Sequence, residues 1–180
     1  MEKQQTGFTL IELMIVIGVL AVLAAVAMPY MRDTILNQRV RTAVTDAHLS
    51  LLLARSEAIK RNSNVNIEKT GSTWDLGWIV CVARAVPDED ECEPAITTLS
   101  TRNALEDVTV DCNTDTDTDA DTCPDFVAFS RVGRPISLIE YRFYVNGNAR
   151  VFMRCVRLSV SGVPRVAIDQ DGNPLNGCQT

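Results

Sequence analysis

The residue with the most unusual chemistry is Glu12, because it lies inside an otherwise apolar run. Between Phe8 and Met28 it is the only charged side chain. A carboxylate at the centre of a membrane-spanning helix costs about 2.5–3.5 kcal/mol, and less near an end, which is where Glu12 lies. One interpretation is a tolerated charge at the interface. The other is a carboxylate that pairs with a cation, and cleavage after Gly7 would create one, the α-amino group of Phe8.

The stretch Gly7-Phe8-Thr9-Leu10-Ile11-Glu12-Leu13 resembles the processing site of type IV pilins and type II secretion pseudopilins. The resemblance implies that a prepilin peptidase cuts after Gly7 and N-methylates Phe8. It also implies that Glu12 neutralises the terminal amine of a neighbouring subunit during assembly. Pro29 lies where such pilins carry a proline that loosens the helix in the fibre. Because proline removes one helical hydrogen bond, Pro29 is the expected position of a helix kink.

Three segments must position these residues. The apolar run of about 21 residues from Phe8 is long enough to cross a bilayer as a helix. An ordinary secretory signal peptide fits poorly, because the leader is nearly neutral and no small-x-small cleavage site follows the apolar core. We therefore expect a leader peptide over residues 1–7, a transmembrane or fibre-core helix over 8–29 and an amphipathic helix over 30–61. On the last helix, seven apolar residues recur on one face at spacings of three and four: Leu36, Val40, Val44, Ala47, Leu51, Ala54 and Ala58.

Beyond residue 62 the sequence changes to short runs typical of strands, at 64–67, 74–82, 126–129, 140–145 and 156–160. Turn residues mark the connections at Gly133, Asn146-Gly147-Asn148 and Gly162. A long helix followed only by strands predicts an α+β fold, with the amphipathic half of the helix packed on an antiparallel β-sheet head. The head is expected to span 62–180 and to lie outside the membrane.

Two further stretches resemble the GspH/FimT branch of minor pilins and pseudopilins. The first is Ala54-Arg55-Ser56-Glu57-Ala58-Ile59-Lys60-Arg61, together with the segment from Trp74 to Trp78. The second is Arg154-Cys155-Val156-Arg157-Leu158-Ser159-Val160-Ser161-Gly162. The segment at about 83–125 matches neither. It is expected to be an acidic loop insertion, since thirteen acidic residues and only Arg102 lie between Asp88 and Asp125.

Six cysteines lie in the head and none in the first 80 residues. An even number of cysteines in a small domain indicates disulfides and an oxidising compartment. A zinc site is the alternative, but the sequence has no Cys-x-x-Cys pair, and the single histidine, His48, is far from every cysteine along the chain. Six cysteines allow fifteen pairings. Sequence neighbours are favoured, because each pair brackets a polar, turn-rich loop: Cys81–Cys92, Cys112–Cys123 and Cys155–Cys178.

The run from Cys112 to Cys123 alternates acidic and small residues. An extended backbone would place four carboxylates on one side of it: Asp115, Asp117, Asp119 and Asp121. Carboxylate oxygens suit calcium, although the spacing does not match an EF-hand loop, whose glycine position falls on Ala120 and whose glutamate position falls on Phe126. The alternative is a solvated acidic loop tied by a disulfide.

A basic motif near the C-terminus is the second candidate binding site. Some FimT-like minor pilins are associated with DNA uptake through a Gly-Arg-x-Arg motif, and the aligned stretch here is Gly162-Val163-Pro164-Arg165, in which valine replaces the first arginine. Arg154, Arg157 and Arg165 are the candidate DNA contacts, since phosphate contacts supply most non-specific affinity. The acidic segment would repel the same backbone. Arginines on the solvent face of a strand are the alternative interpretation.

No nucleophile elbow, phosphate loop or acid–base constellation occurs in the sequence, so we expect a non-enzyme without a cofactor. The resemblance implies a FimT/FimU-like minor pilin that joins the tip or priming complex of a pilus and supports pilus assembly. A GspH-like minor pseudopilin of type II secretion and a DNA-binding minor pilin are the alternatives. The implied partners are other minor and major pilins, the prepilin peptidase and the inner-membrane assembly platform. The implied location is the bacterial inner membrane, with one span and a periplasmic head, and then the pilus.

Overall fold

The computed structural model describes residues 8–83, 92, 98–114, 123–169 and 178. The chain divides into two units, one ending at Ile35 and the other beginning at Leu36. The described residues form one long helix, a short 3-10 helix and eight strands, and all the strands belong to the second unit.

The long helix, α1, runs from Leu10 to Arg61 over 52 residues. It ends where the sequence predicts a stop. Asn62 adopts a left-handed conformation with φ 50. The N–H groups of Asn62 and Ser63 then turn back to the carbonyl oxygens of Ile59 and Ala58, each at 3.3 Å. This is a Schellman motif, and it satisfies carbonyl groups that the end of a helix otherwise leaves without donors.

In the second unit, one face of α1 is buried against the sheets. All seven apolar residues that the sequence places on this face are buried, and Ala43 joins them. Polar contacts add to this packing. Trp78 Nε1 donates to Ser50 Oγ at 2.9 Å, and Arg102 forms an ion pair with Asp46 at 2.9 Å.

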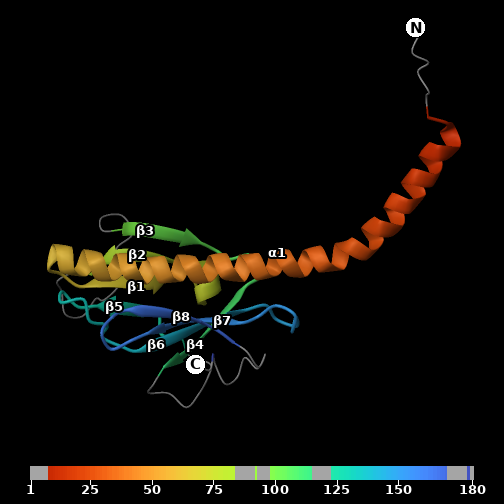
Figure 1. Cartoon of the computed structure of the whole chain (residues 1–180). Coiled ribbons are helices and arrows are strands. Elements are labelled where there is room, and N and C mark those ends of the chain that lie inside the picture. Colours follow the sequence, from red (N-terminus) through yellow and green to blue (C-terminus); the bar gives the residue numbers. More distant parts are fainter. Residues whose placement is uncertain (1–7, 84–91, 93–97, 115–122, 170–177, 179–180) are drawn as a thin grey trace, which may run out of the picture. The chain divides into compact units, whose positions relative to one another are not determined.

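The strands form two four-stranded antiparallel sheets that share one core with this helix face (Figure 1). The first sheet has the order β3-β2-β1-β5, and the second has the order β4-β6-β7-β8. The α+β class is thus confirmed, with two sheets where the sequence predicted one. In chain order the strands are β1 Val65–Lys69, β2 Gly77–Val82, β3 Thr98–Asn103, β4 Thr109–Thr114, β5 Phe126–Phe129, β6 Ile139–Tyr144, β7 Arg154–Leu158 and β8 Pro164–Ile168.

The segment at 83–125 is not a loop insertion throughout, because β3 and β4 lie in it. β3 pairs with β2 and β4 pairs with β6, so each lies at the edge of a different sheet. The side chains of β3 are exposed or half-exposed, which explains why its polar sequence lacks the apolar alternation of a buried strand. β8 is a further strand that the sequence did not predict, because it begins with proline and its side chains are mostly exposed.

The expected strand at 74–82 begins later than predicted, since Trp74–Leu76 form the short 3-10 helix η1. Gly77 follows with φ 105, and a Cβ there would lie 2.3 Å from the carbonyl oxygen of Arg102. Only glycine therefore allows the chain to turn from η1 into β2. Trp74 packs edge-on against Tyr141 of β6, with 4.9 Å between ring centroids, and so joins η1 to the second sheet.

Candidate functional site

In the N-terminal unit, Thr9 and Glu12 are hydrogen-bonded to each other across the first turn of α1. The Thr9 N–H and the Thr9 hydroxyl both donate to Glu12 Oε2 at 2.9 Å. The Glu12 N–H donates back to Thr9 Oγ1 at 3.3 Å. This is a capping box, in which Thr9 is the N-cap and Glu12 is the third helical residue. Sequence reasoning missed this role of Glu12, although Thr-x-x-Glu is its signature.

Only one oxygen of the Glu12 carboxylate takes part in the cap. Both Thr9 donors reach Oε2, and no described residue donates to Oε1. Phe8, directly before the cap, is 92% exposed. Glu12 can therefore hold the start of its own helix and still present an oxygen to a cation from another chain. Gly7 and the peptide bond after it lie outside the described residues, so cleavage there stays a prediction.

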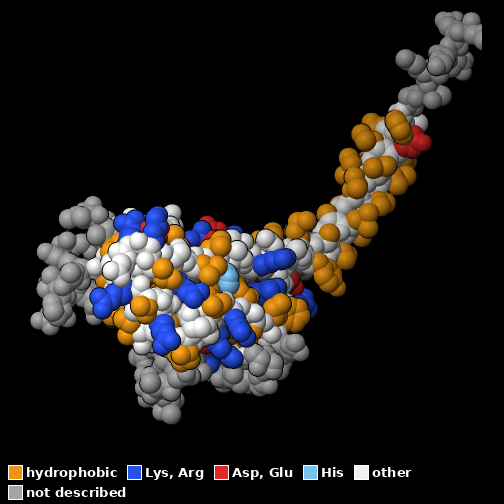
Figure 2. All heavy atoms as spheres, turned by 60° about the vertical axis from the view of Figure 1, so that its left-hand side comes forward, with side chains coloured by type: hydrophobic (Ala, Val, Ile, Leu, Met, Phe, Trp, Pro, Cys, Tyr) orange, Lys and Arg blue, Asp and Glu red, His pale blue; other side chains and the backbone are white. Residues whose placement is uncertain are grey.

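The helix segment that contains Glu12 has the length and composition of a membrane span. Leu10–Ala27 covers 18 residues with a mean hydropathy of 2.8, and none of it is buried within the structure. Its apolar side chains, orange in Figure 2, follow one another along the segment. By length and composition, this helix segment could cross a membrane.

Pro29 lies within α1, and the helix continues through it. Because proline has no N–H, the carbonyl of Ala25 lacks its usual helical donor. The position is thus a weak point in the hydrogen bonding of α1. The kink itself stays a prediction.

The cysteines of the head form three disulfides: Cys81–Cys92, Cys112–Cys123 and Cys155–Cys178. These are the pairs of sequence neighbours that the loop compositions favour. Each of the six sulfur atoms is bonded to one other cysteine sulfur, so none is a thiolate that could bind zinc. The backbone N–H of Cys92 also donates to Glu68 Oε2 at 2.7 Å, which links the first disulfide to β1.

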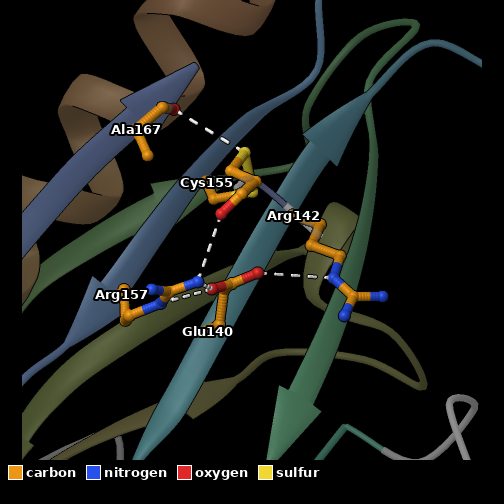
Figure 3. Close-up of a disulfide and its surroundings, with 6 residues drawn as sticks. Glu140, Arg142, Cys155, Arg157 and Ala167 are labelled. Atoms are coloured by element: carbon orange, nitrogen blue, oxygen red, sulfur yellow. Dashed lines mark hydrogen bonds and ion pairs between the residues drawn. A yellow bond between two sulfur atoms is a disulfide. The ribbon is translucent and has the colours of Figure 1, made fainter. Parts of the chain in front are cut away.

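The third disulfide lies beside a charged cluster on the face of the second sheet that points away from α1 (Figure 3). Glu140 Oε2 accepts a hydrogen bond from Arg157 Nε at 2.5 Å, and Glu140 Oε1 lies 3.6 Å from Arg142 Nε. Arg157 also donates to the carbonyl oxygen of Cys178 at 3.2 Å. Glu140 and Arg142 are both buried. A buried carboxylate is stable only when it is paired and hydrogen-bonded, so the cluster and the disulfide together fix Cys178 to β6 and β7.

The three candidate DNA contacts do not share one face of the second sheet. Arg154 is the cross-strand partner of Phe143, a core residue, and therefore projects on the side of α1. Burial, with a smaller effect from the Arg41 guanidinium, lowers the pKa of Arg154. Arg157 and Arg165 are cross-strand partners on the opposite side. On that side Arg157 is already hydrogen-bonded to the carboxylate of Glu140. The structure therefore does not bring the three arginines together on one phosphate-binding surface.

The four candidate calcium ligands, Asp115, Asp117, Asp119 and Asp121, lie outside the described residues. The flanking cysteines are described and bonded, so the ends of this acidic run are held together. Calcium binding stays a prediction, as does the alternative of a solvated loop.

The first part of α1 is apolar and begins with the Thr9–Glu12 capping box, and its later part packs in a disulfide-linked head of two antiparallel sheets. These features define a type IV pilin-like protein. Comparison with family models agrees. Residues 3–28 match the prokaryotic N-terminal methylation motif, and residues 43–162 match the type II transport protein GspH. Because the second match covers more than half of the sequence, the chain belongs to the GspH family, a family of structural pilins rather than enzymes.

The chain is also similar to fimbrial proteins. A fimbrial protein of Pseudomonas aeruginosa is 35% identical over 77 residues, which is 42% of this chain and 50% of the relative. The chain thus spans about half the length of the fimbrial proteins that it matches.

Two solved structures share the fold. The type IV minor pilin FimU of Pseudomonas aeruginosa gives a TM-score of 0.58 at 16% identity, over 79% of this chain and 96% of FimU. The minor pseudopilin EpsH from the type 2 secretion system of Vibrio cholerae gives 0.52 at 12% identity, over 72% of this chain and 97% of EpsH.

Proposed function

We propose that this chain is a minor type IV pilin of the FimT/FimU kind, which joins the tip or priming complex of a pilus and supports pilus assembly. The observation that carries the proposal is the state of Glu12. Its carboxylate lies at the start of an uncovered apolar helix, with one oxygen held by its own cap and the other available. The identity to a fimbrial protein supports a pilus over a secretion system.

In this proposal the prepilin peptidase removes residues 1–7 and methylates Phe8. The new terminal amine is positively charged near neutral pH. A carboxylate and an ammonium group attract strongly in a medium of low dielectric constant, and each is costly to bury alone. The amine of one subunit therefore pairs with Glu12 of a neighbour, and this pair aligns the apolar helices over 8–29. An assembly ATPase elsewhere in the machinery supplies the work.

The proposed location follows from the apolar helix, the amphipathic helix and the disulfide-linked head. The helix over 8–29 anchors the chain in the bacterial inner membrane, where the assembly platform lies, and the amphipathic helix over 30–61 supports the head. Three disulfides in the head suit the oxidising periplasm. After assembly the head over 62–180 lies at the pilus tip or along the fibre, among other minor and major pilins.

The capping box supplies a matched control for a test in the parent bacterium. Glu12→Val removes both the cap and the pairing carboxylate, whereas Thr9→Val removes the hydroxyl of the cap and keeps the carboxylate. We expect both variants to be cleaved. Glu12→Val is expected to be depleted from sheared filaments, as judged by immunoblot, whereas Thr9→Val is incorporated. Equal incorporation of the two variants would contradict the pairing role.

A GspH-like minor pseudopilin of type II secretion is the second candidate, and the match to the GspH model favours it. Deletion of the gene separates the two. Loss of surface pili with normal secretion of exported enzymes supports the pilus, and the reverse phenotype supports the secretion system.

DNA capture is the third candidate, and the separation of Arg154 from Arg157 and Arg165 weakens it. A salt-dependent gel shift with the purified protein tests it, against the variant in which all three arginines are alanine. No shift at low salt excludes this function.

A further inference from the structure

The second sheet ends at β8, whose outer edge has no described partner strand. The other three sheet edges are protected in different ways. β3 and β4 carry polar side chains, and the short β5 is covered by the following chain, where Phe129 bridges to Pro135 and the Ile136 N–H donates to Ala128 O at 2.9 Å. An open edge offers backbone donors and acceptors to another strand, and proteins usually blunt such edges.

The hydrogen-bond register shows which residues of β8 face outward. The Asp169 N–H donates to Met153 O at 3.0 Å, and the Ser159 N–H donates to Val163 O at 3.3 Å. In an antiparallel pair, hydrogen-bonded and non-bonded residues alternate. Val166 and Ile168 therefore direct their N–H and C=O groups away from β7, toward the open edge.

Pro164 occupies the next outward position along β8. Because a proline at such a position costs no bond to β7, the native sequence already respects this alternation.

The side chains at this edge are apolar and uncovered. Val166 and Ile168 are nearly half exposed, and Val160 in the turn before β8 is more exposed still. A groove of about 390 Å³ on α1, lined by Leu52, Leu53, Arg55, Ser56 and Ile59, lies beside the same turn. The link is Arg55, which donates to Gly133 O at 3.2 Å and lies 3.2 Å from where a Cβ on Gly162 would be. Arg55 thus joins the groove on α1 to the turn before β8.

Positive charge lies on both sides of this edge. Arg165 is exposed on the face away from α1, while Arg154 and Arg41 lie on the side of α1. None of the three forms an ion pair with a described residue. A segment that docks here would therefore gain from carboxylates on either of its faces.

These features favour a polypeptide over other anionic partners. The outward N–H and C=O groups of Val166 and Ile168 match the ladder of a strand. Phosphate oxygens can accept from the N–H groups but cannot donate to the C=O groups. Two copies of β8 paired with each other would bring their Arg165 side chains to one face, where like charges repel. The fitting occupant is a strand from a different chain, with acidic residues among β-branched ones.

We propose that β8 is a docking edge that takes an extended, acidic strand from the head of a neighbouring pilin subunit. The inference rests on the proposed function, since only an assembled pilin has such neighbours. The backbone ladder supplies affinity, Val166 and Ile168 supply apolar contact, and Arg165 selects for acidic partners.

The test uses the full-length chain in its own bacterium. The photo-crosslinking amino acid p-benzoylphenylalanine replaces Ile168 and, as a control at another edge, Thr101 of β3. Crosslinked products are identified by mass spectrometry. We expect a crosslink from position 168 to another pilin, in a peptide that contains Asp or Glu, and none from position 101.

Variants with the crosslinker at position 168 test the mechanism. Val166→Pro removes an outward N–H and no bond to β7, so the crosslink yield should fall about twofold to tenfold. Val166→Thr keeps the N–H and loses only part of the apolar contact, so its crosslink yield should stay above that of Val166→Pro. Arg165→Glu should lose the crosslink, and Arg165→Lys should keep it. Intact disulfides and an unchanged melting temperature establish that each variant is folded, and if Val166→Pro does not fold, the Arg165 pair decides.

The two proposals fail in different ways. Absence of the wild-type chain from sheared filaments contradicts the proposed function. If the wild-type chain is in filaments but position 168 crosslinks to no pilin, or Val166→Pro behaves like Val166→Thr, the docking edge is wrong and the function stands. Crosslinks to DNA or to a second copy of this chain also overturn the docking edge.

Discussion

Glutamine in place of Glu140 removes the negative charge that holds two arginines on the outer face of the second sheet. Glutamine has nearly the same shape, so the substitution leaves no cavity. What it changes is the electrostatic pairing. Arg157, which donates to Glu140 at 2.5 Å, loses the negative charge of its partner, although the glutamine oxygen can still accept the bond. Arg142, 3.6 Å from the other carboxylate oxygen, loses the same charge.

The expected loss of stability depends on how deeply the three charged side chains are buried. Removal of one partner of a buried ion pair costs about 3–5 kcal/mol. The side chains of Glu140 and Arg142 are 8% and 4% exposed, but that of Arg157 is 49% exposed and can return to water. Solvent screening of this arginine reduces the expected loss to about 2–3 kcal/mol. For a chain of this size that corresponds to a melting temperature about 4–12 °C lower.

Thermal unfolding of the full-length chain in detergent measures this loss. Trp74 and Trp78 are both buried in the core, so their fluorescence reports on the head. Glu106→Gln is the matched control, because Glu106 forms an ion pair with Arg39 at 3.0 Å but is 81% exposed. An exposed pair contributes at most about 1 kcal/mol. If Glu140→Gln melts no lower than Glu106→Gln, the buried cluster does not stabilise the head and the reasoning is wrong.

Three further predictions concern single features. Tyr141→Phe should leave the melting temperature unchanged or raise it, because the buried Tyr141 hydroxyl has no hydrogen-bond partner among the described residues; a clear fall would reveal a partner. Replacement of both Cys155 and Cys178 by alanine should cost about 3 kcal/mol in urea unfolding, since the disulfide closes a loop with a sequence separation of 23; unchanged stability would show that this bond constrains little. Gly7→Trp should leave a longer, unprocessed protein on immunoblots, whereas a product of mature length would show that cleavage does not need the glycine.

The helix could be predicted from the sequence in detail, because its signals are local. Spacings of three and four placed seven buried residues on one face, and Asn62 stood where a left-handed residue ends α1. The two-sheet arrangement could not be predicted. It depends on which strands pair, and β1 pairs with β5 across about 60 residues of chain. Edge strands such as β3 also carry no apolar alternation, because neither of their faces is fully buried.

In the candidate site, too, the local features could be predicted from the sequence and the long-range contacts could not. Glu12 was recognised from one short stretch, and even its cap with Thr9 could have been read from a spacing of three residues. The pair of Glu140 and Arg157 could not, since it exists only because β6 and β7 align these two residues in register. The separation of Arg154 from Arg157 likewise follows from strand alternation.

The proposed function requires that the chain is cut after Gly7 and assembled with Phe8 as its modified first residue. Mass spectrometry of the protein from purified filaments tests this most directly. We expect an N-terminal peptide that begins at Phe8 and carries one added methyl group. A filament-bound chain that retains residues 1–7, or a chain that is confined to the membrane with an unmodified N-terminus, would contradict it.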